Sequence, residues 1–225
     1  MTNKILYEDN HLIAVEKLPG DLSQGDKSGK TPLPDLVKEY IRTQYNKPGN
    51  VYLGVIHRLD RPVGGVILFA KTSKALERMN KCFKERKNTK KYWALVEGRV
   101  HEQEGRLENY LKKNEKQNKS YVFNNDKSGA KFCALNYKTI SRGDRLSILE
   151  IELETGRHHQ IRCQLANMGH AIRGDVKYGA KRPEKDGYIY LHSVYLEFPH
   201  PTTKETICIE SKPQLPKLWS AIINN

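Results

Sequence analysis

Short strand-like segments dominate this sequence, and they do not alternate regularly with helical ones. One such segment is residues 11–17 (HLIAVEK), and another is residues 146–154 (LSILEIELE). In the second, Leu149, Ile151 and Leu153 alternate with glutamates, which is typical of a strand with one buried face. Because parallel strands need long crossover connections, the pattern predicts an α+β fold with a largely antiparallel sheet.

Periodicity and turn residues place the remaining elements. The expected strands are residues 11–17, 51–56, 65–71, 91–98, 132–140, 146–154 and 188–198. The expected helices are residues 34–45, 73–86, 157–169 and 213–223, the second capped by Thr72 or Ser73. Residues 111–131 are polar and rich in lysine, which favours a solvated loop and leaves a phosphate-contacting arm as the alternative.

The composition narrows the functional classes. A net charge of +13 over 225 residues suits a protein that binds polyanions such as nucleic acid. No run of eighteen apolar residues is present, so we expect no membrane span, and the acidic residues near the N-terminus argue against an export signal. The four cysteines show no C-x-x-C spacing, which fits a reducing, cytoplasmic setting without a zinc knuckle or disulfide framework.

A charged turn precedes one of the most apolar strands. In the segment HRLDRPVGGVILFAK (57–71), Asp60 lies between Arg58 and Arg61. A nearby guanidinium favours the ionised form of a carboxyl group, so this turn is a candidate site for a reactive carboxylate. The alternative is a surface ion pair, which would contribute about 0–1 kcal/mol.

A second basic segment, LETGRHHQIR (153–162), follows a predicted strand. If a helix begins near His158, Arg157 lies at its positive end, where anions bind. Arg162 lies about one turn further on, within reach of a carboxylate on a neighbouring strand. Adjacent helical residues point about 100° apart, so His158 and His159 do not chelate a metal together, and hydrogen-bonding or core roles are favoured.

Together these segments resemble the RluA family of RNA pseudouridine synthases. HRLDRPVGG is similar to the family pattern H-R-L-D-x-x-T-S-G, and TGRHHQIR to T-G-R-x-H-Q-I-R. Four more segments match family patterns in the same order, and the resemblance extends from about residue 5 to about residue 209. These segments are VEKLPGDLSQ (15–24), KKYWALVEG (90–98), GHAIRGDVKYG (169–179) and LHSVYLEFPHP (191–201). The chain departs from the patterns at Leu18, Val63, Gly64 and Ala171, none of which replaces a group expected to do chemistry.

The resemblance implies a fold and an activity. The fold would be a largely antiparallel, mixed central sheet flanked by a few helices and loops, with an active-site cleft across the sheet. We expect residues 1–225 to form a single catalytic domain, or two closely packed subdomains, without the S4 RNA-binding domain that many family members carry. The activity would be isomerisation of specific uridines in rRNA or tRNA, without cofactor or metal, by a cytoplasmic monomer.

The resemblance also assigns roles to individual residues. Asp60 matches the catalytic aspartate, which attacks the sugar, attacks the base or removes a ribose proton; the sequence leaves these routes open, and all need an ionised carboxylate. Arg162 matches its cationic partner, Tyr92 matches a tyrosine that stacks on the target uracil, and Arg58 matches the arginine that fills the space left by the flipped nucleotide. The remaining RNA-contacting positions would be His57, Arg61, Arg157, His159 and Gln160.

Three other readings compete with this one. A retaining glycosidase also breaks a glycosidic bond, but it needs a second carboxyl group about 5 Å from the first, and the two basic segments contain only Asp60 and Glu154. A catalytically idle RNA-binding or chaperone module would share the basic charge. A metal-dependent nuclease would use His57, Asp60 and His158.

Overall fold

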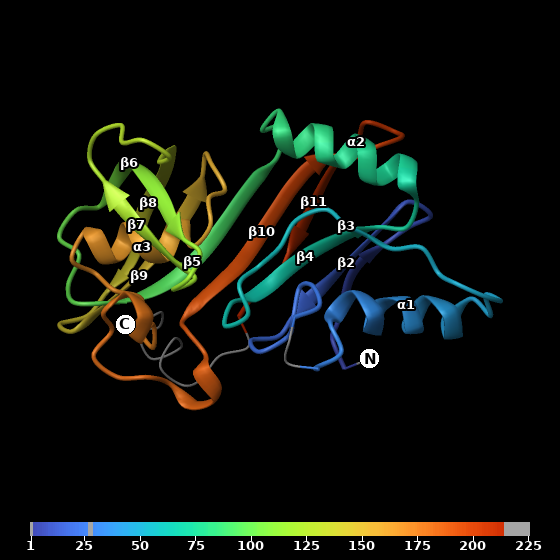
Figure 1. The fold of residues 1–225 in the computed structure, drawn as a ribbon, viewed down its shortest axis with the longest axis horizontal. Coiled ribbons are helices and arrows are strands. Elements are labelled where there is room, and N and C mark those ends of the chain that lie inside the picture. Colours follow the sequence, from blue (N-terminus) through green and yellow to red (C-terminus); the bar gives the residue numbers. More distant parts are fainter. Residues whose placement is uncertain (1, 27–28, 214–225) are drawn as a thin grey trace. The chain divides into compact units, whose positions relative to one another are not determined.

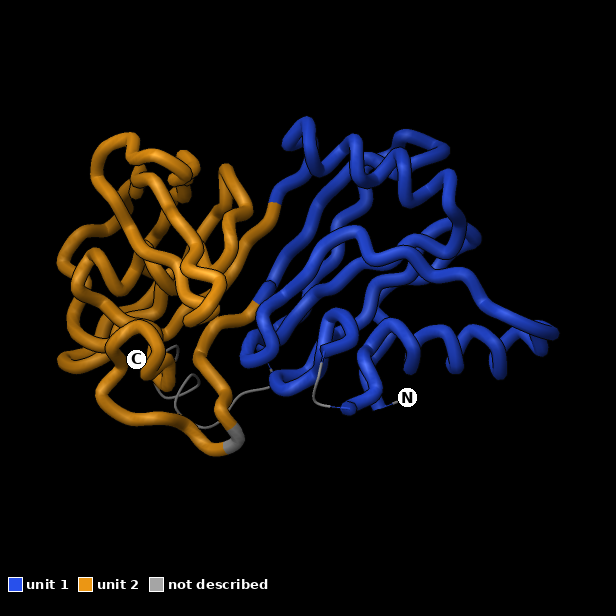
Figure 2. Tube along the Cα trace, in the orientation of Figure 1, with its two compact units in different colours: residues 1–89, 193–213 blue, residues 90–192, 214–225 orange. Residues whose placement is uncertain are grey.

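The computed structural model describes residues 2–26 and 29–213, which fall into two compact units (Figures 1 and 2). The first unit runs up to Thr89 and takes in Ser193–Pro213 as well, and the second covers Lys90–His192. The strand pairs of both units are largely antiparallel, as the sequence predicts. Whether the units make one domain or two subdomains stays a prediction.

The first unit combines six strands with two helices. Its strand order is β1-β2-β4-β10, with β3 paired to β4 and β11 paired to β10. The strands are β1 (Ile5–Glu8), β2 (Leu12–Lys17), β3 (Gly54–Val55), β4 (Gly64–Ala70), β10 (Leu191–Pro199) and β11 (Thr206–Glu210). The helices are α1 (Leu33–Gln44) and α2 (Ser73–Lys84).

The two central strands of this unit are buried on both faces. Every residue of β2 and β4 is buried, which explains why both read as nearly continuous apolar runs. Helix α2 packs Met79 against this sheet, with Leu76 and Phe83 at the edge of the same cluster. The helix begins as predicted, because Thr72 Oγ1 accepts a hydrogen bond from the Ala75 amide at 3.1 Å.

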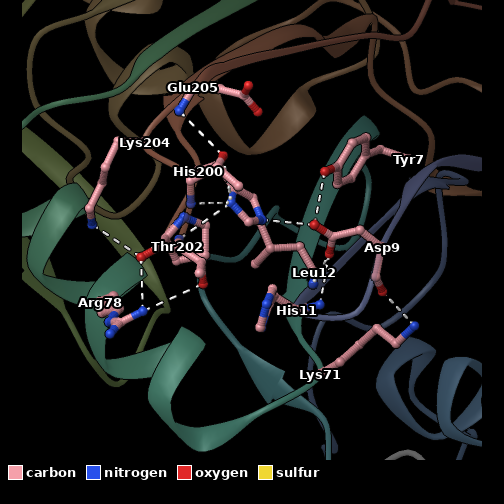
Figure 3. Close-up of polar contacts among 12 residues, drawn as sticks. Tyr7, Asp9, His11, Leu12, Lys71, Arg78, His200, Thr202, Lys204 and Glu205 are labelled. Carbon is pink, nitrogen blue, oxygen red and sulfur yellow. Dashed lines mark hydrogen bonds and ion pairs between the residues drawn. The ribbon is translucent and has the colours of Figure 1, made fainter.

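A partly buried polar cluster joins the β1–β2 turn to the turn between β10 and β11 (Figure 3). His200 Nε2 lies 2.7 Å from Asp9 Oδ2, which also accepts a hydrogen bond from Tyr7 Oη at 3.0 Å. The other oxygen, Asp9 Oδ1, accepts the amides of His11 at 2.8 Å and Leu12 at 2.6 Å. One carboxylate thus holds two turns that lie almost the whole chain apart in sequence.

The second unit is a five-stranded antiparallel sheet with one α-helix and two short 3₁₀ helices among its described residues. Its strand order is β5-β9-β8-β6-β7. The strands are β5 (Thr89–Glu97), β6 (Glu104–Asn114), β7 (Lys119–Phe123), β8 (Lys131–Arg142) and β9 (Leu146–Leu153). The helical elements are α3 (Gln160–Asn167), η1 (Val176–Tyr178) and η2 (Lys185–Gly187).

The prediction of a solvated loop at 111–131 is wrong. The end of β6 pairs with β7 in a hairpin, and β8 begins at Lys131. Leu111 and Ser120 are buried, and Val122 packs on a small apolar cluster. The exposed faces of these strands carry the lysines that masked the strand pattern in the sequence.

Two further predictions concern the chain's helices. The helix expected at 213–223 lies, beyond its first residue, outside the described residues. No helix within residues 2–26 or 29–213 has both the length and the apolar character needed to cross a membrane.

Candidate active site

Asp60 lies half-buried on the turn that connects β3 to β4 in the first unit. Its carbonyl accepts the Val63 amide at 3.0 Å, which closes the turn. The preceding residue, Leu59, is held from both sides by the buried Ser23: Ser23 Oγ donates to the Leu59 carbonyl at 2.7 Å and accepts the Leu59 amide at 3.2 Å. The carboxylate therefore sits on a backbone that a second loop fixes.

A buried lysine fixes the other side of this turn. Lys17, at the end of β2, has no exposed surface. Its ammonium donates to the carbonyls of Leu18 at 3.2 Å, Arg61 at 3.1 Å and Val63 at 2.7 Å. Two of these acceptors lie one and three residues after Asp60, so Lys17 ties β2 to the turn that carries the carboxylate.

The ammonium of Lys17 also contributes to the electrostatics of the turn. Burial lowers the pKa of Lys17 from 10.5 to about 8, against the opposing effect of the negative charges of Asp21 and Asp60. The side chain remains mostly protonated at neutral pH. It is a cation near Asp60 that the sequence analysis did not single out.

The other predicted residues of this turn face different surroundings. The Leu68 amide donates to His57 Nε2 at 3.1 Å, and the His57 ring stacks on Phe83 with centroids 5.5 Å apart. Arg58 is exposed and donates to Gln24 Oε1 at 2.7 Å. Arg61 is exposed as well. Of the three, His57 is tied into the fold, and the two arginines lie at the surface.

Tyr92 lies on β5 in the second unit, opposite Ile151 of β9. Its side chain is buried. Lys90 precedes it by two residues and therefore projects from the same face of the strand. Lys90 is half-buried, and this burial lowers the pKa of its ammonium.

The segment Thr155-Gly156-Arg157 forms a turn between β9 and α3, and Gln160 holds it in place. Gln160 Oε1 accepts hydrogen bonds from Thr155 Oγ1 at 2.8 Å and from the Arg157 amide at 3.0 Å. Helix α3 begins at Gln160, three residues after the expected start at residue 157, because His159 adopts a left-handed conformation with φ of 53°. Arg157 Nε donates to the Phe132 carbonyl at 3.0 Å.

Arg162 forms a buried, two-point ion pair inside the second unit. Its Nε lies 2.6 Å from Asp175 Oδ2 and its Nη2 lies 2.9 Å from Asp175 Oδ1. The guanidinium carbon lies 5.1 Å from the centroid of the Tyr178 ring. The sequence analysis did not single out Asp175 as a partner of Arg162. The expected pairing of Arg162 with Asp60 joins residues of two units and stays a prediction.

The two histidines of the second basic segment lie beside this ion pair. His159 is buried, and its Nδ1 shares a hydrogen bond of 2.9 Å with Tyr178 Oη. Burial, with a further effect of the Arg162 charge, lowers the pKa of His159 to about 2, so the ring is neutral. The rings of His158 and His159 stack with centroids 3.8 Å apart. The structure thus brings His159 and Arg162 together on one tyrosine, Tyr178.

The part of the chain that the structure describes contains no group of side chains that could bind a metal ion together. Within residues 2–26 and 29–213, no three His, Cys, Asp or Glu side chains gather where one ion could bind them. His57 and Asp60 lie in the first unit and His158 lies in the second. The proposed nuclease triad therefore draws on both units.

The chain is similar in sequence to a family model and to named proteins. A family model described as RNA pseudouridylate synthase matches residues 11–167, which include Asp60, Tyr92 and Arg162. The ribosomal large subunit pseudouridine synthase C of Buchnera aphidicola is 32% identical over 218 residues, which cover 94% of this chain and 67% of that protein. The tRNA pseudouridine synthase C of Haemophilus ducreyi is 31% identical over 240 residues, covering 98% and 94%.

Solved structures give the same match at the level of the fold. The human RNA pseudouridylate synthase domain containing 1 superposes with a TM-score of 0.73 at 25% identity, covering 96% of this chain and 86% of that one. The human RNA pseudouridylate synthase domain containing 4 superposes with a TM-score of 0.78 at 20% identity, covering 96% and 90%.

Proposed function

The chain belongs to the RNA pseudouridylate synthase family, and on that premise we propose that Asp60, Tyr92 and Arg162 form its catalytic group. The activity is the isomerisation of uridine in RNA to pseudouridine. The observation that carries the proposal is the family match, because the matched stretch contains all three residues.

The reaction is a rearrangement within one nucleotide. The bond between ribose C1′ and uracil N1 breaks, the uracil turns, and a bond from C1′ to C5 forms. The hydrogen leaves C5 and one is taken up at N1, so reactant and product have the same composition and oxidation state. The balance requires no cofactor, and protein groups are sufficient to bind the base and move the proton.

Asp60 is the proposed carboxylate that acts on the ribose–uracil unit. Support comes from its surroundings, since Ser23 holds the residue before it and Lys17 holds two carbonyls after it. A side chain on a turn between two strands is accessible, while a backbone fixed from both sides keeps its position. Such preorganisation favours a reaction geometry that needs no rearrangement when RNA binds.

Arg162 and Tyr92 are the proposed partners of this carboxylate. Arg162 supplies a positive charge that stabilises the ionised form, and the ring of Tyr92 stacks on the uracil. Both side chains are buried, which suits groups that act in a water-poor pocket. Asp60 belongs to the first unit and the other two belong to the second, so the proposal requires both units to act on one nucleotide.

RNA contacts are proposed for the basic residues around these groups. A stacked uridine hides C1′ and C5, so the nucleotide must flip out at a cost of a few kcal/mol. The exposed, planar guanidinium of Arg58 is suited to fill the space that the base leaves. Arg61 and Arg157 would bind phosphates, while the buried His159 and Gln160 would contribute by shaping the turn that carries Arg157.

The substrate is proposed to be rRNA or tRNA, since the relatives described above are named for one or the other. The net charge of +13 supports a polyanionic substrate of this kind. We propose that the protein acts in the cytoplasm as a monomer.

The proposal is tested with tRNA and rRNA that carry tritium at C5 of uridine, isolated from cells in which the gene is deleted. In buffer with EDTA, the protein should release tritium to water and leave the RNA strand intact. Asp60→Asn should abolish release while RNA binding, measured by filter retention, survives. Strand cleavage, or tritium release by Asp60→Asn at the wild-type rate, would refute the assignment, and binding without release by the wild type would indicate an RNA-binding module.

A further inference from the structure

We propose that Asp175 is a positioning residue for the reaction: together with Tyr178 it forms a cradle that sets the orientation of the Arg162 guanidinium. This inference rests on the proposed function, in which Arg162 supplies the charge beside the reacting carboxylate. It assigns a role to a carboxylate that the proposed mechanism itself does not use.

The geometry of the ion pair restrains the guanidinium in two directions. Asp175 Oδ2 accepts from Arg162 Nε at 2.6 Å, and Oδ1 accepts from Nη2 at 2.9 Å. Two parallel hydrogen bonds align the planes of both groups, so the guanidinium can neither swing nor rotate without breaking one of them. A single contact to an ammonium would not give that restraint.

The turn that carries Asp175 is itself rigid. The Asp175 amide donates to the Ile172 carbonyl at 3.0 Å, and the Asp175 carbonyl accepts the amides of Tyr178 at 3.0 Å and Ala180 at 3.1 Å. Gly174 precedes it with φ of +84°, and a Cβ there would lie 2.8 Å from a backbone carbonyl oxygen. The carboxylate is thus fixed through its own backbone before it meets Arg162.

Tyr178 closes the cradle from the face of the guanidinium. Its ring centroid lies 5.1 Å from the Arg162 guanidinium carbon, within the range of a cation–π contact. The hydroxyl is fixed in turn, because it accepts the Ser120 amide at 2.8 Å and shares a hydrogen bond of 2.9 Å with His159 Nδ1. Asp175 and Tyr178 come from one turn, so a single short segment orients Arg162 on two sides.

The Arg162–Asp175 ion pair differs from a second two-point ion pair of this chain in its burial. The side chains of Arg162 and Asp175 are 6% and 1% exposed. Arg106 and Glu154 make an equivalent two-point pair at 2.8 Å and 2.9 Å, but their side chains are 46% and 34% exposed. Water competes for the exposed pair, whereas it does not reach the buried one. Since a buried ion pair adds little net stability compared with apolar packing, fixing the direction of the charge is the contribution that sets Asp175 apart.

The test compares Asp175→Asn and Asp175→Glu in the tritium-release assay with the labelled tRNA and rRNA. Asparagine presents an NH₂ group to a guanidinium that has only donors, so one of the two hydrogen bonds and the charge are lost. We expect kcat to fall about 10²-fold with KM within about threefold, because Asp175 is buried and the misplaced group acts in the reaction itself. Asp175→Glu keeps the charge but moves it by one methylene, and kcat should fall by about tenfold.

Thermal melting separates loss of position from loss of fold. Asp175→Glu retains the ion pair, so it remains the deciding variant if Asp175→Asn does not fold. Wild-type kcat in either folded variant would overturn the inference. Glu154→Gln is the matched control, which removes the carboxylate of the exposed pair and should leave kcat within twofold.

A double variant decides whether Asp175 acts through Arg162. Combining Asp175→Asn with Arg162→Ala should give the kcat of Arg162→Ala alone, because no guanidinium remains to be positioned. A further loss in the double variant would mean that Asp175 acts independently and would refute the inference. The proposed function fails separately, if Asp60→Asn or Arg162→Ala retains the wild-type kcat.

Discussion

Replacing Lys17 with methionine should lower activity strongly while leaving stability nearly unchanged. The change removes the ammonium that binds the carbonyls of Leu18, Arg61 and Val63. Leu18 O and Arg61 O keep bonds from other backbone amides, so Val63 O, which accepts the shortest of the three bonds, is affected most. A buried carbonyl left without a partner costs about 1–3 kcal/mol.

The same change relieves the burial of a charge. A pKa lowered from 10.5 to about 8 means that folding destabilises the ammonium, relative to the neutral amine, by about 3 kcal/mol compared with the unfolded chain. The cost of the unpaired carbonyl and the gain from removing a buried charge nearly cancel. The free energy of unfolding of Lys17→Met at pH 7 should therefore lie within about 2 kcal/mol of the wild-type value. The turn beyond Asp60, however, loses its anchor, and kcat should fall about 10²-fold.

The assay pairs urea unfolding with tritium release, and Lys71→Met is the control. Lys71 donates to Glu8 Oε1 and to the Asp9 carbonyl, both at 2.7 Å, and does not bind the Asp60 turn in either contact. Its removal should lower the free energy of unfolding by about 1–3 kcal/mol and leave kcat unchanged. If Lys17→Met keeps the wild-type kcat, or if both variants lose kcat equally, the anchoring role of Lys17 is wrong.

The pH dependence gives a second check on Lys17. Its pKa is lower in the folded protein than in the unfolded chain, so between about pH 8 and 10.5 the unfolded chain binds more protons at this site. The free energy of unfolding of the wild type should therefore rise relative to Lys17→Met over that range, and the difference should be constant below pH 7. A difference that stays flat from pH 7 to 10.5 would contradict the assigned burial of the charge.

Two further variants test other parts of the first unit. Gly65 has φ of +112°, and a Cβ there would lie 2.2 Å from the Ser193 carbonyl oxygen. Gly65→Ala should therefore lower the free energy of unfolding, measured in urea, by at least about 3 kcal/mol. Gly25→Ala is the control, because no atom lies within 4 Å of a Cβ there, and it should match the wild type; equal stability of both variants would refute the argument. Burial acts to raise the pKa of Asp9, but hydrogen bonds, above all from the following backbone amides, outweigh it and lower the pKa below 3.8. This stabilising contribution is present above about pH 4 and is lost as the pH falls through the folded-state pKa. Asp9→Asn should therefore be less stable at pH 7 and show a flatter decline in acid, and an unchanged acid profile would contradict this.

Local patterns in the sequence were enough for most of the fold. The alternation in β9, the cap at Thr72 and the apolar stripe of α2 are properties of neighbouring residues, and each predicted its element correctly. The hairpin of β6 and β7 was missed because its lysines lie on the exposed faces and give the segment a polar composition. Composition describes the solvent-facing side of such strands, whereas pairing depends on residues elsewhere in the chain.

The supports of the candidate site were harder to predict than its reactive groups. Asp60, Tyr92 and Arg162 were assigned by resemblance to a family pattern. Lys17 looked like the polar end of an apolar strand, because the carbonyls that bury it lie 44 and 46 residues further along the chain. Asp175 lies 13 residues after Arg162, beyond the helix that carries the arginine. Contacts of this kind have no local signature and emerge only when the chain is folded.

Lys17 and Asp175 share a physical principle. Each is a fully or almost fully buried charged group whose partners are fixed: backbone carbonyls for Lys17, and the guanidinium of Arg162 for Asp175. Buried interactions of this type are screened little by salt, whereas contacts between exposed arginines and phosphates weaken steeply as ions are added. The groups that orient the proposed chemistry are therefore separable from the groups proposed to bind RNA, Arg58 and Arg61 among them. A chain with this division can tolerate changes in its RNA-binding surface without disturbing the orientation of its reactive side chains, because the orienting contacts lie inside each unit.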